Sequence, residues 1–230
     1  MKEILCNSVF FGVMVSILAY ELGMFLKKKF KLAIFNPLLI AMVVVILILC
    51  VLRVDYDSYY TGAKYLSYLL TPVTVCLAIP LYEQLEQLKQ NIAAILAGIV
   101  SGVLTSLTGV FVISLLFHLD HSQYVTLLPK SITTPIGMAI SEELGGIVTI
   151  TVAVILVTGV VGNVLAEIIC KIFRISEPIA KGIAIGSSSH ALGTIKAMEI
   201  GKVEGAMSSL SIVVSGLLTV IGASIYAMFL

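Results

Sequence analysis

The sequence predicts an all-α, polytopic membrane protein, and three observations support that prediction. Hydrophobic residues make up 59% of the 230-residue chain, charged residues only 12%, and the mean hydropathy is +1.11. A soluble domain carries about 25% charged residues, and a water-facing fold of this length cannot enclose so much apolar surface. The apolar residues come in runs of about 20, the length of a membrane-spanning helix. We therefore expect a single membrane domain, residues 1–230, in a lipid bilayer.

The charge and the cysteine content exclude other classes of protein. Lys and Arg total 14 against 13 Asp and Glu, so the net charge is +1 and no basic surface remains for nucleic acid. The four cysteines are scattered without a Cys-x-x-Cys pair. We therefore expect no disulfide framework, no metal site and no cofactor.

Residues 1–91 are expected to be the more regular part, a scaffold. Pro37 falls in the first turns of its span, where it harms a helix least. The expected elements are the spans Ile4–Leu26 and Leu32–Leu52, a tyrosine-rich interfacial segment Arg53–Lys64, a short apolar segment Leu66–Leu81 broken by Thr71-Pro72 and Pro80, and a charged helix Tyr82–Asn91.

Residues 92–230 are expected to be closely packed and irregular, because 15 of the 18 glycines lie there. The expected spans are Ile92–Phe117, Ile147–Ile169 and Ala206–Leu230. Two further segments, Leu127–Gly146 and Gly182–Gly201, are short or interrupted and polar. We expect about six full transmembrane helices and two opposed, re-entrant, broken-helix hairpins. Full crossing by the two segments stays open, because their charges fit either arrangement.

The basic residues predict the topology. With the Lys27–Lys31 loop inside and both hairpins re-entrant, ten Lys and Arg residues lie on the cytoplasmic side and four outside. This split agrees with the positive-inside rule. We therefore expect both termini outside.

Two Thr-Pro pairs in short apolar segments indicate a binding site for a small anion. Paired interrupted segments are typical of transporter sites, and the freed N–H groups of a half-helix attract anions. The candidate substrate-binding residues here are Thr71, Pro72, Thr74, Lys130, Ser131, Thr133, Thr134 and Pro135. Ordinary proline kinks, with threonines refilling the freed hydrogen bonds, are the alternative.

A serine cluster with a histidine lies between glycines in the second irregular segment. Its candidate substrate-binding residues are Ser187, Ser188, Ser189, His190 and Thr194. Histidine can carry a proton or donate to an anion, so His190 is a candidate for proton coupling, as is the acidic Glu142. The alternatives are a histidine that only joins helices, and a headgroup position for Glu142. A Ser-His hydrolase lacks a placed acidic partner, so we expect no enzyme.

We expect the two Thr-Pro breaks and the histidine to converge. Thr71, Thr134 and His190 should lie close together near the middle of the membrane, because each break alone could not neutralise a carboxylate. Asn163 and Glu167, in the second half of their span, could face the same cavity.

Four stretches resemble the LrgB/CidB family: Pro129–Ile136, Gly186–Thr194, Thr71–Tyr82 and Glu204–Leu210. The resemblance runs from about Leu66 to the C-terminus. It implies one of two functions. Some members are antiholin-like or holin-like proteins that modulate murein hydrolases and cell lysis with a small LrgA/CidA-type membrane partner. Others are similar to carriers of small monocarboxylates, the bacterial pyruvate carriers and the plastid glycolate/glycerate translocator.

The residues themselves favour transport, because broken helices, hydroxyl clusters and a membrane histidine suit a small anion. We therefore expect a secondary transporter or transporter subunit for pyruvate, lactate or glycolate, with alternating access and proton coupling. It should lie in the bacterial inner membrane as a homo-oligomer, a dimer, with an LrgA/CidA-like partner. The antiholin-like regulator is the alternative.

Overall fold

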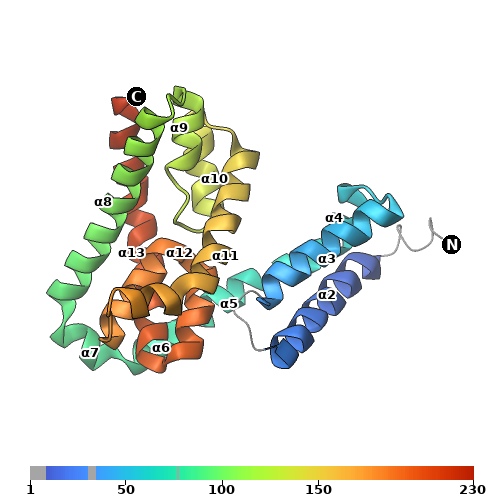
Figure 1. Ribbon diagram of the computed structural model, residues 1–230, viewed down its shortest axis with the longest axis horizontal. Coiled ribbons are helices and arrows are strands. Elements are labelled where there is room, and N and C mark those ends of the chain that lie inside the picture. The colour runs from blue at the N-terminus through green and yellow to red at the C-terminus, as the bar shows by residue number, and fades with distance from the viewer. Residues whose placement is uncertain (1–8, 31–34, 77) are drawn as a thin grey trace. The chain divides into compact units, whose positions relative to one another are not determined.

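The computed structural model describes residues 9–30, 35–76 and 78–230 (Figure 1). Every regular element in these ranges is a helix, so the expected all-α class is confirmed. The chain divides into two compact units, Met1–Cys76 and Leu77–Leu230. The functional division at residue 91 stays a prediction.

The described residues of the first unit form four helices: α2 (Val9–Phe30), α3 (Pro37–Leu52), α4 (Tyr56–Ser67) and α5 (Leu70–Cys76). Asn36 caps α3, since its Oδ1 accepts from the backbone N–H groups of Leu38 at 2.9 Å and Leu39 at 3.3 Å. Pro37 follows at the first helical position, where its missing N–H is no loss. The predicted place of Pro37 in the first turns of its span is confirmed, but α3 begins five residues later than the expected Leu32, and residues 32–34 lie outside the described residues.

The interruption after α4 lies earlier than the Thr71-Pro72 pair. Helix α4 ends at Ser67 and α5 begins at Leu70, so Pro72 belongs to the first turn of α5. A proline in a first turn is tolerated because the early N–H groups have no partner within the helix.

The second unit contains eight α-helices and a terminal 3₁₀ turn within the described residues. These are α6 (Ala78–Glu83), α7 (Leu85–Gln90), α8 (Ile92–Leu116), α9 (His121–Leu127), α10 (Thr134–Glu143), α11 (Val148–Ile172), α12 (Pro178–Ile200), α13 (Lys202–Tyr226) and η1 (Ala227–Phe229).

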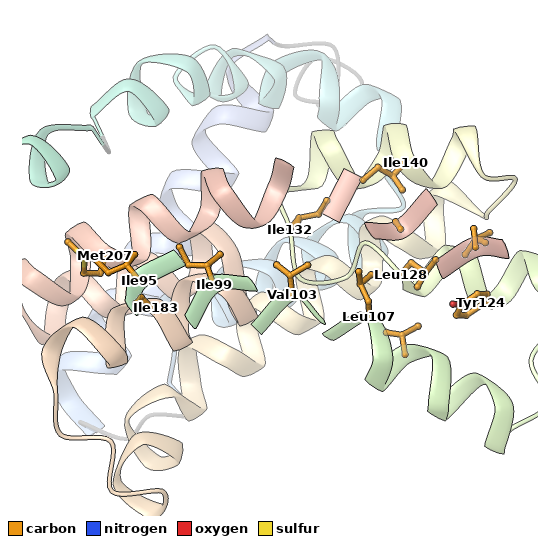
Figure 2. Close-up of a cluster of buried hydrophobic side chains, with 14 of the residues drawn as sticks. Ile95, Ile99, Val103, Leu107, Tyr124, Leu128, Ile132, Ile140, Ile183 and Met207 are labelled. Carbon is orange, nitrogen blue, oxygen red and sulfur yellow. The ribbon is translucent and has the colours of Figure 1, made fainter. Parts of the chain in front are cut away.

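The core of this unit lies along one face of α8. Buried Ile95, Ile99, Val103 and Leu107 recur every four residues, which places them on one stripe of the helix, as Figure 2 shows. Buried side chains from α9, α10, the turn between them, α12 and α13 pack with this stripe, among them Tyr124, Leu128, Ile132, Ile140, Ile183 and Met207. Helix α8 is therefore the common support for both irregular segments.

Helices α9 and α10 form a helical hairpin, residues 121–143, whose two ends lie together. Ser122 Oγ, in the first turn of α9, donates to the carbonyl of Gly145 at 3.2 Å, just beyond α10. The backbone N–H of Ile147 donates to Thr126 Oγ1 at 2.7 Å. The turn between the two helices, which contains Lys130 and Ser131, is the tip of the hairpin.

Helix α12 is also a hairpin, because it reverses at His190. That residue has φ 42° and ψ −141°, outside the helical region. Beyond it, Gly193 lies so close to Ile185 that a Cβ on it would be 3.1 Å from the Ile185 carbonyl oxygen. Lys181 and Glu199 border one cavity, although 18 residues of straight helix would separate them by about 27 Å. The two limbs of α12 therefore run back along each other.

The two hairpins belong to opposite ends of the second unit. The α9–α10 hairpin follows the C-terminal end of α8, whereas the α12 hairpin follows the C-terminal end of α11 (Figure 1). Their placement as re-entrant elements in a bilayer stays a prediction.

In the part of the chain that the structure describes, five helical stretches are long and apolar enough to cross a membrane: Phe10–Phe30, Tyr56–Glu83, Ile92–Leu116, Val148–Ile172 and Lys202–Phe229. A multi-pass chain is thus confirmed, but the expected count of six full spans is not. Helix α3 is apolar but has 16 residues, about 24 Å of helix against a hydrocarbon core of about 30 Å.

Candidate functional site

The tips of both hairpins reach the middle of α8. Ser131 Oγ, in the tip of the α9–α10 hairpin, is 3.1 Å from Ser106 Oγ. In the α12 hairpin, Ser187 packs on Gly102, where a Cβ would lie 2.7 Å from the Ser187 hydroxyl oxygen. Gly102 and Ser106 are one turn apart, about 6 Å along the helix. The fold thus brings Ser131 and Ser187 to the same stretch of α8.

Lys130 adds a positive charge at this tip. Its ammonium donates to Ser131 Oγ at 3.0 Å, and the residue is half-buried. An ammonium beside two hydroxyls is a suitable partner for a carboxylate.

The α12 hairpin contacts α11 as well as α8, and it is the reversal at His190 that packs against α11. His190 Nε2–H donates to the Ile155 carbonyl at 3.0 Å, and the imidazole is buried. Gly159 makes room for the ring, since a Cβ there would lie 2.6 Å from His190 Cε1. Gly162 makes room for the Ser189 side chain, which a Cβ at that position would overlap. Ile155 also packs against Gly137 of α10, so one turn of α11 contacts both hairpins.

The backbone of His190 is strained. A non-glycine residue in a sparsely populated region of φ and ψ costs about 1–3 kcal/mol, and glycine would avoid that cost. Here the ring is held by its hydrogen bond to α11 and by its close packing on Gly159. These contacts of the ring with α11 offset a backbone strain that glycine would not have.

Side chains from the neighbouring helices satisfy the backbone around the reversal. Asn163 Nδ2 of α11 donates to the Leu192 carbonyl at 2.6 Å. Thr194 Oγ1 donates to the His190 carbonyl at 3.0 Å and is 2.7 Å from Ser208 Oγ of α13. Buried carbonyls freed by a break need such partners. The break is therefore an ordered polar centre among α11, α12 and α13.

A cavity of 460 Å³ lies between α8 and the first limb of α12. Ser101, Gly102 and Ser187 line it together with apolar side chains, and Glu177 borders it. The volume is within the range of small-molecule sites.

The structure brings together only some of the predicted site residues. Lys130, Ser131 and Ser187 meet at α8, and Ser189, His190 and Thr194 surround the reversal. Ser188 is exposed and donates to the Ala184 carbonyl of its own helix at 2.7 Å. Four other candidates lie at the two ends of α10: half-buried Thr133 and Thr134, exposed Pro135, and exposed Glu142.

The remaining candidates, Thr71, Pro72 and Thr74, belong to the first unit. Thr71 and Pro72 are exposed there, and the side chain of Thr74 lies outside the described residues. Convergence of Thr71, Thr134 and His190 stays a prediction.

Several residues of this centre were not singled out in the sequence. Gly159 and Gly162 support the reversal, and their spacing of three on one helix face was the available signal. Ser208 pairs with Thr194. Glu167, expected to face the cavity, contacts the Lys196 ammonium.

Comparison with known proteins gives one family. The profile described as "LrgB-like family" matches residues 16–229. The chain is 39% identical over 222 residues to proteins named "Antiholin-like protein LrgB" from Bacillus cereus and from Bacillus anthracis, a match that covers 96% of this chain and 96% of each relative. No solved structure matches the chain at a significant level.

Proposed function

Because this chain belongs to the LrgB-like family, we propose that it is an antiholin-like regulator of murein hydrolase activity and cell lysis. The chain is a multi-pass bacterial membrane protein. The observation that carries the proposal is its 39% identity, over nearly the full length of both chains, to proteins named antiholin-like. In this proposal it acts with a small LrgA/CidA-type membrane partner.

Deletion and complementation test this proposal. Loss of the protein should raise murein hydrolase activity and speed the lysis of stationary cells, and expression of the wild-type chain should reverse both. Lysis is followed by turbidity, and hydrolase activity by the release of labelled cell-wall fragments. Unchanged lysis and hydrolase activity in the deletion strain would contradict the antiholin-like role.

A second candidate function, a carrier for a small monocarboxylate, is favoured by the reversal at His190. A membrane anchor needs neither a strained buried histidine held by its neighbours nor a 460 Å³ cavity along the first limb of the same hairpin. In this proposal Lys130 with Ser131 binds the carboxylate of pyruvate, lactate or glycolate. The two hairpins then move against the remaining helices to alternate access. His190 and Glu142 are the proposed proton carriers.

Uptake into proteoliposomes separates the two candidates. The vesicles contain the purified protein and a trapped neutral dye, and uptake of labelled pyruvate is measured together with dye loss. A carrier should give saturable uptake, inhibited by competing monocarboxylates, with the dye retained. Lys130→Gln should abolish uptake, whereas Lys28→Gln, which removes an equal charge from α2, should not. Dye leakage in proportion to protein, with no saturation, would contradict the carrier.

Co-purification tests the proposed assembly. We expect the chain to purify as a dimer and to retain an LrgA/CidA-type partner when the two are expressed together. Mass measurement of the detergent-solubilised complex reports both.

A further inference from the structure

We propose that a second, basic cavity in this protein binds a phosphate-bearing ligand. The cavity has a volume of 780 Å³ and lies where α11 ends and the two limbs of the α12 hairpin come together. It is separate from the polar centre around His190 and does not depend on either proposed function. Its lining residues are Glu167, Cys170, Lys171, Arg174, Ile175, Ser176, Lys181, Glu199 and Ile200.

The charges around this cavity are unbalanced. Lys171, Arg174 and Lys181 line it and form no ion pair within the described part of the chain. The two carboxylates at its border, Glu167 and Glu199, share the ammonium of Lys196. The lining thus holds three positive and two negative charges, and both negative ones already contact the Lys196 ammonium. The cavity therefore attracts an anion.

The chemistry of the three cations favours phosphate over a simple carboxylate. A phosphate monoester carries a charge of about −1.5 to −2 near neutral pH, which is more than the single negative charge of a carboxylate. Three cations in one lining therefore suit a phosphate better than a carboxylate. Arginine offers a planar fork that matches phosphate oxygens in pairs, and lysine adds a compact charge. Ser176 places a hydroxyl in the same lining.

The position of the cavity allows two sources of phosphate. Arg174, Ile175 and Ser176 lie beyond the last residue of α11, where lipid headgroups meet a membrane helix. The same cavity could equally take a free phosphate compound from solution. The two sources share the phosphate group, and the experiment below separates them.

Arg53 provides a matched control for Arg174. Arg53 is the residue after α3, and Arg174 is the second residue after α11. Both have a left-handed backbone, with φ 50° at Arg53 and φ 55° at Arg174. A residue in this conformation closes a helix end, a position at which glycine is usual. Replacing either arginine by glutamine should therefore have a similar effect on folding. Arg53 belongs to the first unit and is not among the residues that line the basic cavity.

The test is a thermal unfolding titration. Purified wild-type protein in a neutral detergent is unfolded at increasing concentrations of inorganic phosphate, and the dissociation constant follows from the saturable rise in Tm. We expect Arg174→Gln and Lys181→Gln to weaken binding about tenfold each, since one charge-assisted hydrogen bond is worth about one factor of ten. Arg53→Gln should bind phosphate like the wild type.

A second arm uses nanodiscs of phosphatidylcholine with or without phosphatidylglycerol. Stabilisation by phosphatidylglycerol but not by inorganic phosphate, lost in Arg174→Gln, would support the proposal with a lipid headgroup as the ligand. Stabilisation by inorganic phosphate, lost in the same variant, would support it with a free phosphate compound.

The proposal is overturned if neither probe stabilises the wild type, or if both raise the Tm of the wild type, Arg174→Gln, Lys181→Gln and Arg53→Gln equally. Equal shifts would reflect the general exclusion of phosphate from protein surfaces. Lys181→Arg keeps the charge and should bind phosphate like the wild type. Such a result would show that Lys181→Gln binds weakly because it lacks the charge and not because it folds poorly.

Discussion

Replacing Gly159 with alanine should destabilise the reversal of α12. The new methyl group would lie 2.6 Å from His190 Cε1, 2.7 Å from His190 Nε2 and 2.7 Å from Leu192 Cδ1. Since a real Cβ does not approach so closely, the imidazole must shift and its bond to the Ile155 carbonyl must weaken.

The magnitude follows from three contributions. Overpacking costs about 1–3 kcal/mol, and the weakened hydrogen bond adds about 0.5–1.5 kcal/mol. Alanine recovers at most about 1 kcal/mol through its better helix propensity. With that recovery subtracted, the net loss of about 0.5–3.5 kcal/mol should lower Tm by about 1–14 °C in a chain of this size.

Gly109 of α8 supplies the matched control. It also lies inside a long membrane helix, but a Cβ there would meet no atom within 4 Å. Gly109→Ala should therefore leave Tm unchanged or raise it slightly. Adding His190→Ala to Gly159→Ala should recover part of the loss, because the clashing ring is removed. Equal Tm values for the two glycine variants would refute the reasoning.

Three further predictions concern the reversal of α12 and the topology of the chain. His190→Gly should keep the fold, because glycine accepts the left-handed backbone, yet abolish monocarboxylate uptake in proteoliposomes; normal uptake would make the imidazole structural only. Thr194→Val should cost about 1–3 kcal/mol, measured by thermal unfolding, because it removes the partner of a buried serine hydroxyl; an unchanged Tm would contradict this. Single cysteines introduced near Lys29 and near Ser122 test the topology in intact cells with an impermeant thiol reagent. Labelling near 122 but not near 29 is expected, and the opposite result would contradict the predicted topology.

Much of the architecture could be predicted from the sequence, because a bilayer leaves few choices. Lipid offers no hydrogen bonds to the backbone, so an apolar run of sufficient length must be a helix. The preference of proline for the first turn of a helix also predicted that Pro37 lies near the start of its span, as it does in α3. The two irregular segments stood out by their Gly, Pro and polar residues, and both form helical hairpins within the described chain.

The position of each break was harder to predict, because packing overrides local preference. Backbone preference alone would place a left-handed residue at Gly186 or Gly193, but α12 reverses at His190, where Gly159 and Gly162 of α11 receive the ring and Ser189. The first unit likewise interrupts its helix at Tyr68 and Leu69, ahead of Thr71-Pro72.

The composition and pattern of the chain therefore determined that it is a helical membrane protein, where its irregular segments lie, and which family it resembles. Only the tertiary structure decided the pairing of Asn163 with Leu192, of Thr194 with Ser208, and of Lys196 with Glu167. The physical reason is that these contacts depend on the rotation and depth of one helix against another. Those are set by the fit of many side chains at once, and no local pattern along the chain encodes them.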